Sequence, residues 1–141
     1  MFNVIVWASD GSEPSDRALS YARKLAEESS AELIALHVRE ITVGRSAGYP
    51  VQIDEDEVEG KIESQAKEMK DSGINARYAQ AGAAYGGAAH AIAETAESNG
   101  ADLIVVGTRG QGPVAGLLLG GVTQRLLHIS SCPVLAVPPE S

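Results

Sequence analysis

The sequence has little of what marks secreted, membrane-spanning or nucleic-acid-binding proteins. Its 141 residues include one cysteine, so no internal disulfide can form, which fits a reducing compartment. Basic residues are few: 11 Lys and Arg face 19 Asp and Glu, a net charge of −8, which argues against a basic surface for nucleic acid or anionic membrane. No apolar run approaches the length of a membrane span. The chain opens on an apolar run without a basic leader, so we expect a cytoplasmic protein that binds no nucleic acid and no membrane.

Hydrophobic residues instead follow two alternating patterns. Five short apolar runs are typical of strands, and three are near-continuous, which indicates burial on both faces of a parallel sheet. They span residues 4–8, 33–38, 76–80, 103–106 and 133–137. Apolar residues at helical spacing lie between them, and these patterns stop at Gly73, at Gly100 and before Pro133. We therefore predict one α/β domain over residues 1–141, with right-handed crossovers and a long irregular stretch at residues 40–54.

A glycine-rich run lies between the fourth predicted strand and the last helix. Residues 107–125 hold six of the chain's 15 glycines. Ligands bind at the carboxyl ends of the strands in an open parallel sheet, and a helix N-terminus there suits phosphate. A Walker loop does not fit, because Gly112 is followed by Pro113, and the dinucleotide fingerprint is missing after the first strand. The alternative is a loop of glycine turns that ends in a helix cap.

The spacing Gly107-x2-Gly110-x9-Gly120 resembles the nucleotide-binding motif of the universal stress protein family, Gly-x2-Gly-x9-Gly-Ser/Thr. The similarity covers nearly the whole chain; it continues in Asp10-Gly11-Ser12 and in residues 36–38, 100–107 and 131–137. The resemblance implies an adenine nucleotide alpha hydrolase-like fold, with one open parallel five-stranded sheet in the order 3-2-1-4-5 and helices on both faces. It also implies a homodimer through the last strand, Val134–Val137, which would otherwise be an exposed apolar edge.

The resemblance further implies that ATP, together with Mg²⁺, binds at the carboxyl edge of the sheet. Asp10 would lie near the nucleoside, with backbone near Val38 and Val106 around the adenine. The phosphates would rest on the backbone of the glycine run and on the helix start after Gly120. The predicted nucleotide-binding residues are Ala8, Asp10, Val38, Val106, Gly107, Arg109, Gly110, Gly120, Gly121, Val122 and Thr123.

One position departs from the family motif, because Gly121 stands where the motif has Ser or Thr. A hydrogen bond to a charged group is worth about 1.5–3 kcal/mol, or roughly 10- to 100-fold in affinity. Thr123 could supply the missing hydroxyl, or could hydrogen-bond within the first turn of its helix. Arg109 is either a phosphate contact or a solvated loop residue. For Asp10 the alternative is an N-cap or a turn residue, and we favour contact with the ligand because of the motifs that accompany it.

No residue stands out as a general base, and the glycine run contains no lysine. We therefore favour a nucleotide-dependent stress-response sensor or switch over an enzyme, with at most slow ATP hydrolysis. Two alternatives remain open: a dimer that acts through protein partners without ATP, and a protein that binds cyclic AMP.

Three other patterns are weaker. Gly44-Arg45-Ser46-Ala47-Gly48 matches the nucleophile elbow, but Tyr49-Pro50 follows in place of a helix, so a serine hydrolase using Ser46 is a remote alternative. The acidic run at residues 54–59 is best explained as the acidic first turn of a helix. The histidines show no zinc spacing, and we expect no metal site.

Overall fold

The computed structural model of the chain contains one sheet of five parallel strands in the order β3-β2-β1-β4-β5. It describes residues 1–41, 55–84, 86–108 and 121–140. The strands are β1 (Val4–Ser9), β2 (Glu32–Ile41), β3 (Asn75–Ala84), β4 (Leu103–Gly107) and β5 (Val134–Val137). The predicted fold class and strand order are therefore confirmed.

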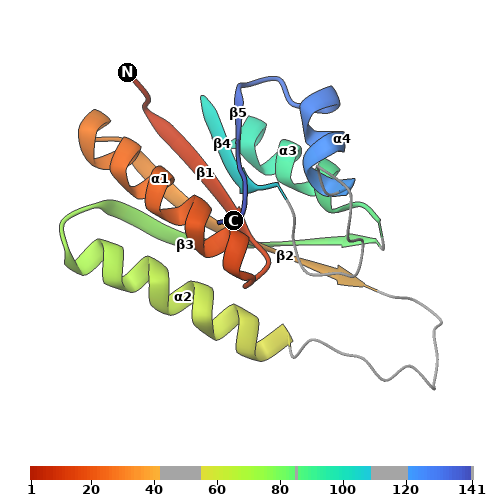
Figure 1. The fold of residues 1–141 in the computed structure, drawn as a ribbon, viewed down its shortest axis with the longest axis horizontal. Coiled ribbons are helices and arrows are strands. Elements are labelled where there is room, and N and C mark those ends of the chain that lie inside the picture. Colours follow the sequence, from red (N-terminus) through yellow and green to blue (C-terminus); the bar gives the residue numbers. More distant parts are fainter. Residues whose placement is uncertain (42–54, 85, 109–120, 141) are drawn as a thin grey trace.

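Four helices cover the two faces of the sheet (Figure 1). The helices α1 (Glu13–Ser29) and α2 (Glu55–Asp71) pack on one face, and α3 (Ala88–Ser98) and α4 (Gly121–Ile129) pack on the other. Each face has its own core of buried apolar side chains. Trp7 of β1 belongs to the core under α1 and α2, whereas its neighbour Val6 belongs to the core under α3 and α4. This is the alternation expected of a strand buried on both sides.

Local sequence explains where α1 begins and how closely it packs. Ser12 is its N-cap, and Pro14 lies in the first turn, where proline is tolerated. The buried residues Ala18, Ala22 and Ala26 recur every four positions, so small side chains face the sheet. α2 opens with three acidic residues, as predicted for the run at residues 54–59, and they favour the positive end of the helix dipole.

The pair β2 and β3 is longer than the apolar patterns predicted. Their register runs from Glu32 opposite Asn75 to Ile41 opposite Ala84. The prediction that residues 40 and 41 begin an irregular stretch is wrong, because backbone pairing with β3 continues through them. Pairing between strands thus overrides weak local preference at charged and glycine positions. The rest of that stretch, residues 42–54, lies outside the described residues.

The amino edge of the sheet is held by polar contacts across strands. The carboxylate of Asp102, just before β4, accepts hydrogen bonds from the backbone N–H groups of Asn3 (2.9 Å) and Val4 (3.2 Å). Arg77 of β3 donates to Glu32 of β2 over 2.8 Å. Within the described part of the chain, no helix has both the length and the apolar character needed to cross a membrane.

Candidate functional site

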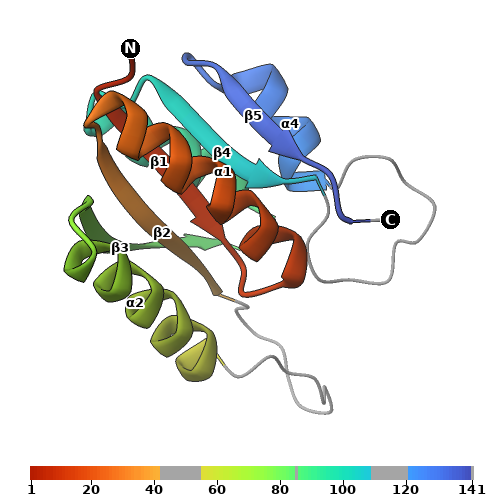
Figure 2. The ribbon, with the colours of Figure 1, turned by 60° about the vertical axis from the view of Figure 1, so that its left-hand side comes forward.

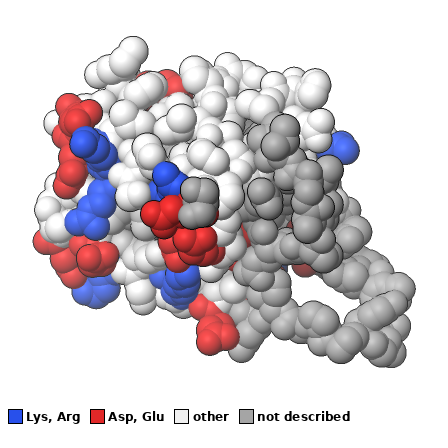
Figure 3. Space-filling view, in the orientation of Figure 1, with Lys and Arg blue, Asp and Glu red and all other residues white. Residues whose placement is uncertain are grey.

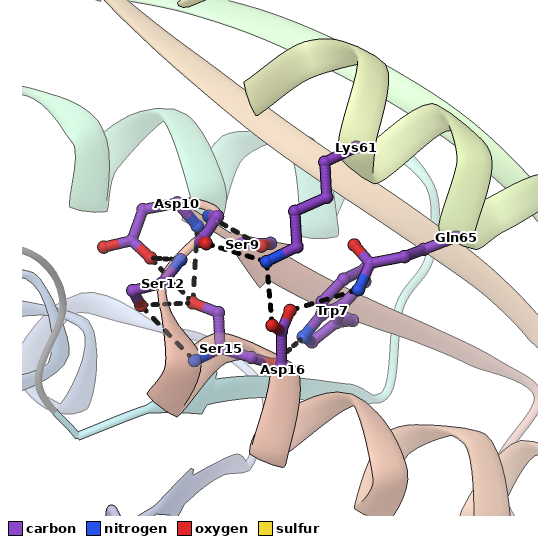
Figure 4. Close-up of polar contacts among 9 residues, drawn as sticks. Trp7, Ser9, Asp10, Ser12, Ser15, Asp16, Lys61 and Gln65 are labelled. Atoms are coloured by element: carbon purple, nitrogen blue, oxygen red, sulfur yellow. Dashed lines mark hydrogen bonds and ion pairs between the residues drawn. The ribbon is translucent and has the colours of Figure 1, made fainter. Parts of the chain in front are cut away.

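The loop between β1 and α1 lies at the carboxyl edge of the sheet and is closely hydrogen-bonded (Figure 4). Oδ1 of Asp10 accepts from the backbone N–H of Ser12 and from the hydroxyl of Ser15, each over 2.9 Å. The hydroxyl oxygen of Ser9 accepts from the N–H of Gly11 over 3.0 Å. The interpretation of Asp10 as a turn residue is confirmed, whereas the N-cap of α1 is Ser12 and not Asp10.

Ser15 connects this loop to the core. Its side chain is buried, with 4% of the residue exposed. Its backbone carbonyl accepts a 3.0 Å hydrogen bond from the indole Nε1 of Trp7, which is fully buried. The indole N–H of a buried tryptophan needs such a partner. The first turn of α1 is therefore held against the core on one side and against Asp10 on the other.

Helix α2 holds the same loop from the side. Nζ of Lys61 donates to the carbonyl of Gly11 over 2.9 Å and to Oδ2 of Asp16 over 2.8 Å. Gly11 has a φ of +82°, which favours glycine, and a Cβ added there would lie 3.1 Å from Val58 of α2. Gln65 donates to the other oxygen of Asp16. Charged side chains of both signs cover this side of the molecule (Figure 3).

The end of β4 meets the starts of two helices. A Cβ on Gly107 would lie 2.9 Å from the carbonyl carbon and oxygen of Pro14 in the first turn of α1. The hydroxyl of Thr123, in the first turn of α4, donates to the carbonyl of Gly107 over 2.8 Å. The N-terminus of α4 and the first turn of α1 therefore both lie beside this strand end, and the free N–H groups at the start of α4 carry the positive end of its dipole. Figure 2 shows α1 in front of the sheet, near β1 and β4, and α4 behind β5.

The structure places the predicted site residues in two groups. Ala8, Val38 and Val106, at or near the carboxyl ends of three neighbouring strands, belong to the core cluster under α3 and α4. Gly121 and Val122 are exposed at the start of α4, and a Cβ on Gly121 would meet no atom within 4 Å. Arg109, Gly110 and Gly120 lie outside the described residues, as does Ser46.

Thr123 uses its hydroxyl within the protein. The residue is buried, and its hydroxyl hydrogen is given to Gly107. The acceptor lies in β4, so the alternative of a bond within the first turn of the helix is wrong. In this arrangement Thr123 joins the first turn of α4 to the end of β4.

A second polar cluster lies where β2 meets α2. The buried ring of His37 places Nε2 3.0 Å from Oε1 of Glu55, the first residue of α2. Arg39 donates to Asp56 over 3.1 Å, and this hydrogen bond is the main cause that raises the Arg39 pKa. These pairs tie the helix start to the strand. Among the described residues, no group of three or more His, Cys, Asp and Glu side chains could hold a metal ion.

Burial raises the pKa of Tyr78 to about 12, and the negative charges of Glu59 and Glu63 add to the effect. The raised pKa means that the folded protein holds the phenol proton more tightly than the unfolded chain does. The phenol therefore stabilises the fold fully below pH 10, the usual tyrosine pKa, and this contribution is lost as the pH rises through about 12.

Sequence reasoning missed Ser15, Lys61 and Gln65. Ser15 had a signal, because it follows the N-cap Ser12 by three residues and Asp10 by five, within one helical turn of the loop. Lys61 and Gln65 had none, since their contacts join α2 to a loop 45 or more residues earlier in the chain.

Known proteins resemble this chain over its whole length. The model of the universal stress protein family matches residues 1–138. Universal stress protein YxiE from Bacillus subtilis is 37% identical over 150 residues, which cover 97% of this chain and 99% of that protein. The solved structure of protein MJ0577 superposes with a TM-score of 0.81 at 23% identity, covering 100% and 99% of the two chains. A universal stress protein in complex with cAMP superposes with a TM-score of 0.73 at 29% identity, covering 96% and 97%.

Proposed function

Because the chain belongs to the universal stress protein family, we propose that it binds an adenine nucleotide at the carboxyl edge of its sheet. One observation carries the proposal: the end of β4 at Gly107 is enclosed by the first turns of α1 and α4, beside the loop that carries Asp10. Backbone N–H groups at the start of α4 favour an anion, and the apolar strand ends beside them favour a flat base.

Each part of the nucleotide has a place in this proposal. The adenine would contact the strand ends at Ala8, Val38 and Val106. The carboxylate of Asp10 would accept hydrogen bonds from nucleoside hydroxyls. The phosphates would lie near Gly107 and the exposed residue Gly121, and Arg109, Gly110 and Gly120, which lie outside the described residues, remain proposed contacts. Mg²⁺ would offset phosphate charge, which matters in a protein with a net charge of −8.

ATP is the nucleotide that we favour, and cyclic AMP is the competing ligand. A relative of similar fold is in complex with cAMP, so a cyclic monophosphate is compatible with this architecture. We propose that the protein binds the nucleotide in the cytoplasm and acts as a nucleotide-dependent sensor or switch, with at most slow ATP hydrolysis. A general base for hydrolysis must accept a proton from the attacking water. In the described part of the site, Oδ1 of Asp10 already accepts hydrogen bonds from Ser12 and Ser15, so this oxygen is poorly suited to that role.

We also propose a homodimer through β5. Val134–Val137 forms an edge of the sheet, where unpaired backbone groups can accept a second strand. A groove of about 1030 Å³ lies alongside, and its apolar lining includes Phe2, Tyr21, Leu25, Leu103 and Leu135. Sedimentation should give the mass of a dimer, whereas Leu135→Glu should give a monomer of unchanged secondary structure. A wild-type monomer at high concentration would refute this part of the proposal.

The first experiment identifies the nucleotide. The purified protein is denatured and the released molecules are identified by mass spectrometry, and the emptied protein is titrated with ATP–Mg²⁺ and with cyclic AMP by calorimetry. Retained ATP or micromolar binding supports the proposal. Binding of cyclic AMP alone changes the ligand but keeps the site. A protein that is purified empty and binds neither would refute nucleotide binding and would favour a dimer acting through protein partners.

A further inference from the structure

The side chain of Ser15 contacts both the backbone and the side chain of Asp10. The Ser15 hydroxyl has one hydrogen, which it donates to Oδ1 of Asp10 over 2.9 Å. The same oxygen accepts from the backbone N–H of Asp10 over 3.3 Å. A hydroxyl donor to a carboxylate is among the stronger hydrogen bonds in proteins, and this one comes from a residue that is only 4% exposed.

The direction of the carboxylate follows from where the donors lie. Ser15 and the N–H of Ser12 both donate to Oδ1 of Asp10, so together they fix the rotation of the carboxylate about its side chain (Figure 4). With the Ser15 hydroxyl removed, Oδ1 of Asp10 loses one of these two donors, and the carboxylate gains rotational freedom. A ligand would then have to restrict that freedom on binding, which lowers affinity.

Ser15 is itself held in place by the interior of the protein. Its N–H donates to the hydroxyl of Ser12, and its carbonyl accepts from the indole of the buried Trp7. The preceding residue, Pro14, lies against Gly107 at the end of β4. The position of the Ser15 hydroxyl is thus set by the core and by the strand next to the proposed phosphate site.

We propose that Ser15 is the positioning residue of the nucleoside site: it does not touch the ligand but holds the Asp10 carboxylate in the orientation that accepts the nucleoside hydroxyls. This inference rests on the proposed nucleotide site. It adds a determinant of affinity that lies beneath the surface, in the first turn of α1.

The test compares two serines of the same helix. Ser15→Ala removes the hydroxyl, and alanine suits a helix, so the variant should fold. Ser20→Ala is the matched control, because Ser20 is exposed and its hydroxyl donates only to Arg17 of its own helix. Ser15→Thr restores a hydroxyl, and Asp10→Asn removes the charge of the carboxylate. Each variant and the double variant are titrated with ATP–Mg²⁺ by calorimetry, or with cyclic AMP if wild-type protein binds that ligand instead.

We expect Ser15→Ala to weaken binding by about 10-fold, Ser20→Ala to leave it unchanged, and Ser15→Thr to recover most of the loss. In the Asp10→Asn background, Ser15→Ala should cost much less, since the two residues act through one contact. The inference is overturned if Ser15→Ala binds like wild type while Asp10→Asn is impaired, if the two effects add in full, or if Ser15→Thr binds as weakly as Ser15→Ala.

Failure of the nucleotide proposal gives a different result. Wild-type protein that binds neither nucleotide refutes the site, and the inference with it. Wild-type binding that Asp10→Asn leaves unchanged keeps the nucleotide but removes Asp10 from its recognition, and so overturns the role of Ser15 alone.

Discussion

An aspartate lies at each end of the parallel strands, and the two aspartates make different kinds of contact. At the amino edge, Asp102 accepts from Asn3 and Val4, which are 99 and 98 residues away in the chain, and so joins the start of β1 to the start of β4. At the carboxyl edge, Asp10 accepts from Ser12 and Ser15, which are two and five residues away. The first contact joins two distant strands, whereas the second holds the β1–α1 loop and the first turn of α1. We therefore expect substitution of Asp102 to change mainly the stability of the fold, and substitution of Asp10 to change mainly ligand binding.

The largest effect on stability should come from substitution of Gly107, because the end of β4 packs closely against the first turn of α1 at this residue. Gly107→Ala would place Cβ 2.9 Å from the backbone of Pro14, which cannot move aside cheaply. We expect the free energy of unfolding, measured in urea, to fall by about 2–3 kcal/mol. The control is Gly60→Ala in α2, where a Cβ meets no atom within 4 Å and alanine should stabilise the helix by about 0.5–1 kcal/mol. Equal stabilities for the two variants would contradict the predicted clash.

A change at the start of α4 should alter binding without altering stability. Gly121→Ser restores the hydroxyl of the family motif at a position with open space around it. We expect ATP–Mg²⁺ affinity to rise by about 10-fold in calorimetry, because a new donor meets a charged phosphate. Gly60→Ser is the control. Unchanged affinity would show that backbone N–H groups are sufficient at this position.

The amino-edge aspartate should show the reverse behaviour. Asp102→Ala removes the acceptor for two backbone N–H groups, and we expect unfolding to become easier by about 1 kcal/mol. Nucleotide affinity should stay within twofold of wild type, as an estimate from the distance between the two edges. A loss of binding that exceeds the loss of stability would mean that the two edges are coupled, and the contrast drawn between Asp102 and Asp10 would fail.

The smallest effect concerns the contacts from α2. Lys61→Met removes the donor to Gly11 and Asp16, and these groups are partly exposed, so we expect a loss of about 0.5 kcal/mol in unfolding free energy and a small loss of affinity. Lys67→Met is the matched control on the same helix, because among the described residues Lys67 pairs with Asp71, one turn away. If the two variants match in both measurements, α2 does not help to hold the loop.

The residues alone predicted an α/β domain with a parallel sheet, because the apolar runs of β1 and β4 are near-continuous, as in strands buried on both faces. The strand order was predicted from the resemblance to the universal stress protein family. The strands β2 and β3 are longer than the sequence predicted, mainly at their carboxyl ends. Arg39, Glu40 and Gly82 have little intrinsic preference for strands, and only the partner strand keeps them extended. Such pairing forms only in the assembled sheet, so the local sequence pattern of either strand does not predict it.

Part of the candidate site was also predictable from the sequence, and the part that was not depends on contacts in the assembled sheet. Asp10 directly follows β1 and Gly107 is the last residue of β4, so the rule that ligands bind at the carboxyl ends of strands finds both residues. Thr123 shows the limit: its place in the sequence suggests a phosphate donor, but its hydroxyl faces the carbonyl of Gly107. Which way a side chain points depends on the neighbouring strand, and the sequence near Thr123 does not specify that neighbour.

The fluorescence of Trp7 can report on the contact between the core and the first turn of α1. It is the only tryptophan in the chain, it is fully buried, and its indole donates to the carbonyl of Ser15. Its intrinsic fluorescence therefore comes from a single emitter at a single hydrogen bond, next to the turn that carries Asp10. The protein contains its own optical probe of that turn, and no label needs to be attached to follow it.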